Sequence, residues 1–324
     1  MPNLKIEMKK LHTLILESQK ILILTHDSPD LDAMSSIFSL SHIFDHFHKP
    51  YTILFKQKPP KYLVSLDAQK TYEIDEQILT QPLSHDLIII VDAGDLLHTG
   101  LEKQLILLKG KIIIVNIDHH QTNTNFGDIN IVVPDAVSTT EIIYDIFQNF
   151  KIKITEKIAN HILAGILTDT NNFTNFNTTS KSLEIASDLI AKGSNISRVL
   201  KLSRQKKSIE EMQAWGKIFS RLTKNQEQNI AYTIITKDDI SQYSKDPSVL
   251  DGLSNYLNNI SDAKISLVIR EMPDNTIKIS MRTNDDLIDV SKFAKMYNGG
   301  GHKKAAGFSI KGKLEKTQEG WKII

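Results

Sequence analysis

Four short polar clusters in this sequence hold the side-chain types that bind metal ions. The first three follow short apolar runs, and the fourth follows a helical pattern that ends near Leu167. Together the clusters offer at least four carboxylates and two or three imidazoles. They are His26-Asp27-Ser28-Pro29-Asp30-Leu31-Asp32, Asp92-Ala93-Gly94-Asp95, Asp118-His119-His120 and Thr168-Asp169-Thr170.

A single Asp or His at a strand end is usually a cap or a turn residue, but four such clusters indicate a cation site. Carboxylates that are crowded together without a compensating charge have strongly raised pKa values and cost stability. Oxygen-rich sites with some imidazole and no sulfur suit Mn²⁺ or Mg²⁺ better than structural zinc. Two ions about 3.5–4 Å apart that share a carboxylate would use all of these ligands, and such a pair activates a bridging water for attack on phosphorus.

Short apolar runs and helical patterns must position these clusters. The runs 21–25, 87–91 and 112–117 are continuous rather than alternating, which is typical of strands buried on both faces of a parallel sheet. Helical patterns separate them, for example at 31–47 and 139–150. This α/β alternation predicts a doubly wound, mainly parallel sheet with helices on both faces. Because such sheets bind ligands at the carboxyl ends of their strands, we expect three clusters at one edge.

The pattern changes after about residue 186, and a smaller α+β domain is expected there. We therefore predict an N-terminal metal-binding domain at 1–186, a linker at 187–207 and a C-terminal domain at 208–324. The expected elements of the second domain are helices at 208–222, 248–259 and 289–297, strands at 229–236, 263–270 and 276–282, and a last strand after the glycine run.

Composition and charge exclude several classes of protein and of functional site. The 324 residues include no cysteine, which excludes disulfides, thiolate metal sites and a cysteine nucleophile. The apolar runs are far shorter than the ~18 residues of a membrane helix, and the charged N-terminus lacks a signal-peptide core, so a cytoplasmic protein is expected. The net charge of +1 lacks the basic excess typical of proteins that grip long nucleic acid. The basic segment 192–224 is either a solvated connecting helix or one wall of an anion cleft.

The ordered clusters resemble the DHH phosphoesterase family. The resemblance is carried by Asp118-His119-His120, the His-x-x-x-Asp-x-Asp run that starts at His26, Asp92 between them and Asp169 after them. The run Gly299-Gly300-Gly301-His302-Lys303-Lys304-Ala305-Ala306-Gly307 is similar to the signature of the DHH-associated C-terminal domain. Length and layout are most similar to the short bacterial oligoribonucleases that also dephosphorylate 3′-phosphoadenosine 5′-phosphate.

The resemblance implies that the N-terminal domain is catalytic and holds two Mn²⁺ ions, with Mg²⁺ as a substitute. His120 would lie beside the phosphate as a substrate contact or proton donor. Asp118 would orient a ligand imidazole through its distal nitrogen, and Asp95 is expected to be a turn residue. The implied ligands are His26 and Asp30 on one ion, Asp32, His119 and Asp169 on the other, and Asp92 as the bridge.

The resemblance also implies that the C-terminal domain binds substrate. Its glycine run would bind the far end of the substrate, with Gly300, Gly301 and His302 facing a phosphate or a base. Glycines let backbone N–H groups approach an anion closely, although three in a row can also be only a flexible turn. Arg282, at the end of the preceding strand, is expected to clamp a phosphate.

The expected function is that of a manganese-dependent phosphoesterase using a bridging hydroxide. It would hydrolyse oligoribonucleotides, from dimers to pentamers, to 5′-mononucleotides and dephosphorylate 3′-phosphoadenosine 5′-phosphate. The alternatives are a phosphodiesterase for cyclic or linear diadenylate, a manganese inorganic pyrophosphatase and a catalytically silent nucleotide-binding sensor. The expected partners are short oligoribonucleotides and nucleoside bisphosphates, but neither a membrane nor long duplex nucleic acid, and a homodimer is left open.

Overall fold

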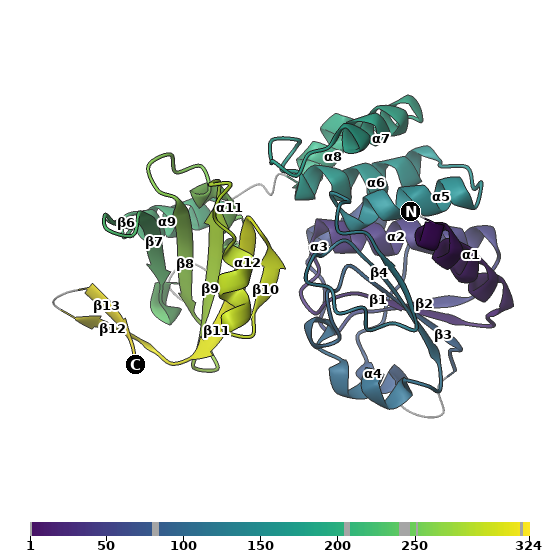
Figure 1. Cartoon of the computed structure of the whole chain (residues 1–324), viewed down its shortest axis with the longest axis horizontal. Coiled ribbons are helices and arrows are strands. Elements are labelled where there is room, and N and C mark those ends of the chain that lie inside the picture. The colour runs from purple at the N-terminus through teal and green to yellow at the C-terminus, as the bar shows by residue number, and fades with distance from the viewer. Residues whose placement is uncertain (1, 80–83, 204–207, 240–246, 251, 318–319) are drawn as a thin grey trace. The chain divides into compact units, whose positions relative to one another are not determined.

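The computed structural model describes residues 2–79, 84–203, 208–239, 247–250, 252–317 and 320–324. The chain divides into two compact units, Met1–Gln205 and Lys206–Ile324 (Figure 1). Within the described ranges, no helix has the length and apolar character needed to cross a membrane.

The first unit is built on a five-stranded parallel sheet with the order β2-β1-β3-β4-β5. The central strands β1 and β3 are buried along their whole length, as their continuous apolar sequences predict. The predicted doubly wound, parallel architecture is thereby confirmed. The strands are β1 (Ile21–Leu24), β2 (Tyr51–Leu54), β3 (Leu87–Val91), β4 (Ile113–Asp118) and β5 (Ile129–Val132).

Helices cover both faces of this sheet (Figure 1). Successive residues of β1 point to opposite sides, so Ile21 and Ile23 join the larger core while Leu22 and Leu24 join the smaller one. The helices on the larger side are α1 (Pro2–Glu17), α2 (Leu31–His46), α5 (Thr139–Asn149), α6 (Glu156–Asp169), α7 (Ser180–Ala191) and α8 (Ile196–Ser203). Of the shorter elements, α3 (Lys61–Val64) and η1 (Ser65–Asp67) also pack on the larger core. The 3-10 helix η2 (Glu76–Leu79) and α4 (Glu102–Leu108) pack on the smaller core, and η3 (Leu97–Thr99) precedes α4.

The segment 187–207, which the sequence analysis assigns to a linker, is mostly helical. It contains the end of α7 and all of α8. Leu189 and Val199 from these helices are buried in the larger core, so the first unit extends to Gln205 rather than to residue 186. Some of the basic residues that suggested a linker lie on the exposed faces of these amphipathic helices. Of the basic segment 192–224, residues 204–207 lie outside the described ranges.

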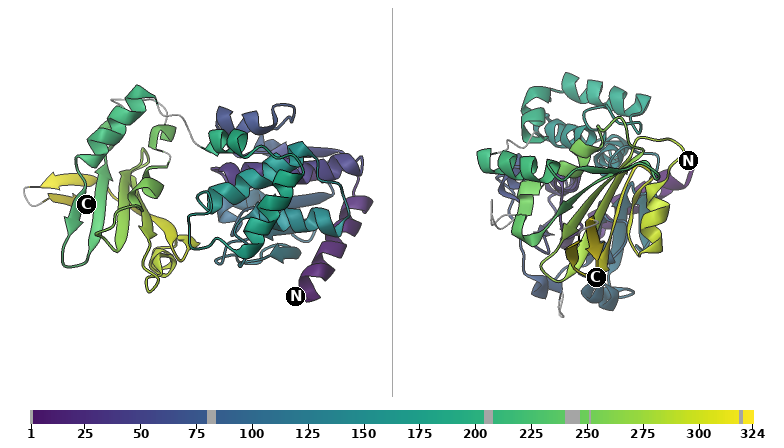
Figure 2. Two further views of the ribbon diagram at one scale, coloured as in Figure 1. Left: turned by 90° about the horizontal axis from the view of Figure 1, so that it is seen from above. Right: turned by 90° about the vertical axis from the view of Figure 1, so that its left-hand side faces the viewer.

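The second unit is the smaller α+β domain that the sequence predicts. Its six-stranded sheet has the order β10-β11-β9-β8-β7-β6, in which β7 and β8 run parallel and the other neighbours run antiparallel. The helix α12 packs on one face, and α9 and α11 pack on the other; Figure 2 shows α9 in green along the strands. The strands are β6 (Thr223–Asn225), β7 (Ile230–Ile235), β8 (Ile265–Glu271), β9 (Thr276–Thr283), β10 (Gly300–His302) and β11 (Ala305–Lys311), and the hairpin β12 (Leu314–Thr317) and β13 (Gly320–Ile323) follows them. The helices are α9 (Ile209–Phe219), η4 (Pro247–Leu250), α11 (Leu253–Leu257) and α12 (Val290–Met296).

Candidate functional site

Three of the four polar clusters lie at one edge of the parallel sheet. His26 comes just after β1, Asp92 directly follows β3, and His119 directly follows β4. These three strands are neighbours and run parallel, so their carboxyl ends lie side by side. The strand order reverses between β1 and β3, which is where open α/β sheets form a ligand crevice.

Asp92 is the centre of the site. His26 Nε2 lies 3.8 Å from Asp92 Oδ2, and His119 Nε2 lies 3.6 Å from Asp92 Oδ1. Asp169, at the end of α6, reaches the same place from the larger-core side, with its Oδ2 3.2 Å from His119 Nε2. The structure thus brings the six expected ligands together. Three groups with ligand atoms within 4.8 Å of one another share Asp92. Two of them consist of expected ligands alone, namely His26, Asp30 and Asp92, and Asp32, Asp92 and His119; the third joins Asp92 to Asp118 and His120.

Asp32 is fully buried and is held by the start of α5. Its Oδ2 accepts a 2.7 Å hydrogen bond from the Thr139 backbone N–H, and its Oδ1 accepts bonds from Thr140 N–H at 3.2 Å and Thr140 Oγ1 at 2.9 Å. These donors offset the cost of burying a carboxylate. Gly165 of α6 leaves the necessary space, because a Cβ there would lie 2.2 Å from Asp32 Oδ1.

Asp92 is held by both its backbone and its side chain. Its φ of +55° lies in the left-handed region, which a residue other than glycine occupies at a cost in free energy. The Thr139 hydroxyl donates a 2.8 Å hydrogen bond to Asp92 Oδ1. Thr139 therefore contacts two expected ligands, Asp92 through its side chain and Asp32 through its backbone.

Sequence reasoning missed Thr139, Thr140 and Gly165. The sequence signal that was available was the Ser138 cap before α5, whose hydroxyl accepts a hydrogen bond from the Glu141 N–H. A cap identifies a helix start, but it does not reveal that the helix start faces Asp32. The contact joins residues that are more than a hundred positions apart in the chain.

The carboxyl groups of the site are buried and lie close to one another, and both effects raise their pKa values. Burial, and then the charge of Asp92, raises the pKa of Asp32 to about 7. Burial, and then the charge of Asp30, raises the pKa of Asp92 to about 7, and burial with the charge of Asp32 does the same to the pKa of Asp169. A divalent cation relieves this repulsion, and carboxylate oxygens with imidazole nitrogens are a donor set that Mn²⁺ and Mg²⁺ accept. The residues present therefore fit a metal site.

His120 is paired with Asp118. Its Nδ1 lies 2.7 Å from Asp118 Oδ1, while Asn123 Nδ2 donates a 2.6 Å bond to Asp118 Oδ2. Burial favours a higher pKa for Asp118, but the hydrogen bond and charge of His120 lower this pKa to about 2. Burial opposes protonation of His120, but Asp118 raises the pKa of His120 to about 9. Asp118 therefore favours the protonated form of His120.

This pairing differs from the expectation that Asp118 orients a ligand imidazole. Asp118 bonds His120, whereas the ring nitrogen Nδ1 of the ligand candidate His119 lies 3.3 Å from the Ala136 carbonyl oxygen. Asp95 has the expected turn role, because its Oδ1 accepts a 2.8 Å bond from the His98 backbone N–H.

The second unit places two expected substrate-binding residues in one row of its sheet. Ala305 on β11 is paired with Arg282 on β9 and with His302 on β10, so all three side chains lie on the face opposite α12. At about 4.8 Å per strand, Arg282 and His302 are roughly 10 Å apart. Gly301 has φ +129°, and a Cβ there would lie 2.4 Å from the Ala305 carbonyl oxygen, so β10 and β11 require this glycine for their close approach.

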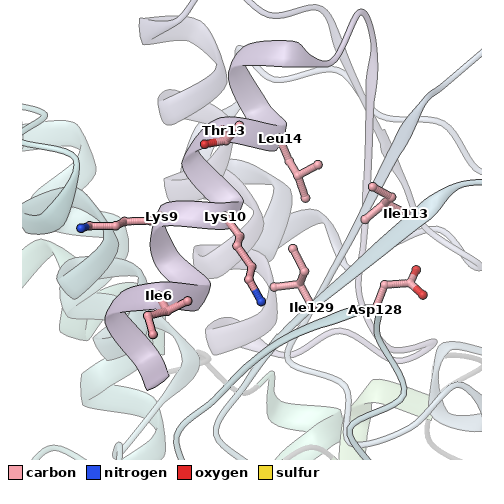
Figure 3. Close-up of a pocket in the computed structure, with 8 residues that line it drawn as sticks. All are labelled: Ile6, Lys9, Lys10, Thr13, Leu14, Ile113, Asp128 and Ile129. Carbon is pink, nitrogen blue, oxygen red and sulfur yellow. The ribbon is translucent and has the colours of Figure 1, made fainter. Parts of the chain in front are cut away.

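A pocket of about 480 Å³ beside α1 lies elsewhere (Figure 3). Its lining includes Ile113 and Ile129, the first residues of β4 and β5. It is therefore at the amino ends of these strands, opposite the edge that carries Asp92 and His119, and it takes no part in the site.

Two family models match this chain. Residues 20–166 match the DHH family, N-terminal domain, and residues 227–323 match the DHHA1 domain. The chain therefore belongs to the DHH phosphoesterase family, as its motifs predict, and it is a hydrolytic enzyme of the nuclease and phosphatase type.

Several known proteins are similar to it over both units. The bifunctional oligoribonuclease and PAP phosphatase NrnA of Bacillus subtilis is 29% identical over 90% of this chain and 89% of that protein. The cyclic-di-AMP phosphodiesterase GdpP of Geobacillus thermodenitrificans is 28% identical over 90% of this chain but 45% of its own length. A solved exopolyphosphatase-related protein from Bacteroides fragilis has a TM-score of 0.81 at 24% identity, covering 94% of this chain and 90% of that one, which supports the fold.

Proposed function

We propose that this enzyme hydrolyses short oligoribonucleotides to 5′-mononucleotides and removes the 3′-phosphate of 3′-phosphoadenosine 5′-phosphate, with Mn²⁺ as its metal. The observation that carries the proposal is the pair of ligand groups that share Asp92 at the carboxyl edge of the sheet. The similarity to the Bacillus subtilis protein, which extends over 90% of the chain, supports this choice of substrates.

Six residues are proposed to hold two metal ions. When bound, such a pair supplies Lewis-acid activation of the phosphoryl group and of the attacking water. The contribution of the chain is to fix the ligands beforehand, through the start of α5 and the strained backbone of Asp92. The proposed ligands are His26, Asp30, Asp32, Asp92, His119 and Asp169.

His120 is proposed to act on the substrate itself. Asp118 accepts the Nδ1 proton and raises the pKa of His120 to about 9, so Nε2 can carry a second proton, with which it can contact a phosphate oxygen or protonate the leaving oxygen. Asp118 thus favours the charged form of His120, and Asn123 keeps Asp118 in place.

The second unit is proposed to bind the part of the substrate that lies away from the scissile bond. Arg282 and His302 lie in one row of its sheet, next to the glycines of β10. A guanidinium and an imidazole suit a phosphate, and the glycine backbone can approach an anion closely. Binding at such a remote point favours short substrates with a defined length.

A second candidate is hydrolysis of cyclic or linear diadenylate. The 28% identity to GdpP over 90% of this chain favours it, although this chain matches only 45% of the length of that protein. The same proposed metal ligands would serve both reactions, so the distinction would depend on the substrate-binding surface.

A substrate panel at fixed enzyme and Mn²⁺ concentrations tests the proposal. It contains a ribodinucleotide, a ribopentanucleotide, long RNA, 3′-phosphoadenosine 5′-phosphate, both diadenylates and pyrophosphate. We expect the fastest turnover on the two short oligoribonucleotides and on 3′-phosphoadenosine 5′-phosphate. Faster hydrolysis of pyrophosphate or of long RNA would refute the proposal, and faster hydrolysis of a diadenylate would select the second candidate.

A further inference from the structure

A second group of convergent polar side chains lies in the first unit, outside the ligands described above. It consists of His42 on α2, Asp67 in η1 and His161 on α6. Each offers one ligand atom, and the three atoms lie within 4.8 Å of one another. Asp67 and His161 are each only 2% exposed, so the group is part of the protein interior.

Three buried polar atoms of this group lack the partners that such atoms normally have. His42 Nε2, Asp67 Oδ2 and His161 Nδ1 make no hydrogen bond to any part of the chain that the structure describes. His42 Nε2 and Asp67 Oδ2 face each other at 3.5 Å. Buried polar atoms are nearly always satisfied by protein, water or an ion, so this convergence points to a bound species.

The other ring nitrogens indicate where the protons lie. His161 Nε2 is 3.3 Å from the Leu66 carbonyl oxygen, which can only accept, so the proton is on Nε2 and Nδ1 carries a lone pair. His42 Nδ1 is 3.4 Å from Asp45 Oδ2, which favours a proton on Nδ1 and leaves the Nε2 lone pair toward Asp67. Histidines that bind metals usually have this arrangement, with the distal N–H directed at a carbonyl or carboxylate.

The lone pairs of the group remain available to an ion, although neighbouring lysines oppose a positive charge there. Lys157 Nζ lies 2.7 Å from Asp67 Oδ1 and balances the charge of this carboxylate, while Oδ2 faces His42 and keeps its lone pairs. Burial, and then the charge of Lys70, lowers the pKa of His42, and burial lowers the pKa of His161 to about 4. Both imidazoles are therefore neutral near pH 7, and no proton competes for their lone pairs.

We propose that His42, Asp67 and His161 hold a divalent ion of the zinc type. Two imidazoles and one carboxylate are the donor set of zinc sites that keep one position open for water. The 3.5 Å between His42 Nε2 and Asp67 Oδ2 fits two ligands of a tetrahedral ion with bonds of about 2.0–2.2 Å. The fourth position is left for water.

This site is separate from the catalytic one, although it uses the same two helices. His42 follows Asp32 on α2 by ten residues, or ~15 Å along the helix, and His161 precedes Asp169 on α6 by eight residues, or ~12 Å. The ion would join α2, α6 and the short η1 that carries Asp67. It would thereby fix the helix pair that presents Asp32 and Asp169 to the catalytic centre.

The direct test is anomalous diffraction at the zinc absorption edge from crystals of the full chain equilibrated with Zn²⁺. We expect an anomalous peak between His42 Nε2 and Asp67 Oδ2, in addition to any signal at the catalytic ligands. This measurement needs no variant. Density for a water molecule alone, with no anomalous signal, would overturn the proposal.

Zinc stoichiometry after equilibrium dialysis gives an independent test. We expect the wild type to retain about one more Zn²⁺ per chain than Asp67→Asn or His42→Gln, measured by plasma mass spectrometry. The contribution of the catalytic ligands is the same in each protein and cancels in this difference. His85→Gln is the matched control, because His85 is also buried but its Nε2 lies 3.0 Å from Thr52 Oγ1. Equal zinc contents in variants with native circular dichroism would contradict the assignment.

Discussion

Asp92 combines a strained backbone with contacts to several other functional groups. The motif identified it from the sequence, because a carboxylate directly follows a buried strand. Its φ of +55° and its hydrogen bond from Thr139 could not be predicted, because both depend on how β3 meets the start of α5 in the folded chain. At the residue scale, the sequence therefore predicts which side chains could bind metal but not which neighbours hold them.

Replacing Thr139 tests this support directly. Thr139→Val removes the hydroxyl that bonds Asp92 Oδ1 but keeps the backbone N–H that bonds Asp32. We expect a loss of about 10–100-fold in Mn²⁺ affinity or in kcat, the usual effect of removing a group that orients a metal ligand. The measurement is the Mn²⁺ dependence of 3′-phosphoadenosine 5′-phosphate hydrolysis. Thr139→Ser keeps the hydroxyl and should resemble the wild type, and a fully active Val variant would show that the bond is dispensable.

The elements were predictable where the sequence pattern was strong. The central strands of the parallel sheet are continuous apolar runs, and they were predicted within a residue or two. The sheet edges β2 and β5 were not, because they are short and only partly buried. The segment 187–207 looked like a linker because its basic side chains dominate its composition, while few apolar residues, such as Leu189 and Val199, anchor its helices.

The close packing of α6 against Asp32 makes Gly165 a critical residue of its helix. A Cβ at Gly165 would lie 2.2 Å from Asp32 Oδ1 and 2.3 Å from Thr140 Oγ1. We expect Gly165→Ala to displace the Asp32 carboxylate, to lower the melting temperature and to reduce activity by at least about 10–100-fold. Thermal melting and kcat together measure these effects.

Gly216 in α9 provides the matched control for Gly165. It is an exposed residue within a helix, and a Cβ there would meet nothing within 4 Å. Gly216→Ala should stabilise the chain by about 0.5–1 kcal/mol, because alanine loses less backbone entropy on folding. If both substitutions had the same effect on melting and activity, the packing argument for Gly165 would be wrong.

At the scale of the whole molecule, the buried and mutually repelling carboxylates lower the stability of the metal-free fold, and metal binding should remove this destabilisation. The raised pKa values of Asp32, Asp92 and Asp169, each about 7, mean that these three carboxyl groups bind more protons in the metal-free folded chain than in the unfolded chain between pH ~4 and 7. The contribution of these groups to stability is thus present at low pH and is lost as the pH rises through this window. Their protons must also leave when a cation binds.

We therefore expect Mn²⁺ to raise the melting temperature more at pH 7.5 than at pH 5. The measurement compares chelator-treated protein with and without Mn²⁺ at both pH values. Asp169→Asn removes one of the repelling carboxylates, so the decrease in metal-free stability with rising pH should be shallower in this variant. A metal-free wild type whose stability has the same pH dependence as that of Asp169→Asn would contradict this account.

The second unit should contribute to substrate affinity rather than to the chemical step. Removing a charge-assisted hydrogen bond costs about 1.5–3 kcal/mol, so Arg282→Ala should raise KM for a ribodinucleotide by roughly 10–100-fold. A small phosphodiester that cannot reach the second unit should be hydrolysed at the wild-type rate. An equal loss on both substrates would show that Arg282 has a structural or catalytic role instead.

Release of 5′-AMP from 3′-phosphoadenosine 5′-phosphate by chelator-treated protein, before and after addition of Mn²⁺, tests the central claim most directly. The account predicts no product before the addition, full recovery after it, and a loss of more than about 100-fold in Asp92→Asn, because Asp92 is shared by both ligand groups. Full activity without metal, or wild-type activity in Asp92→Asn, would contradict the two-metal site at the edge of the sheet.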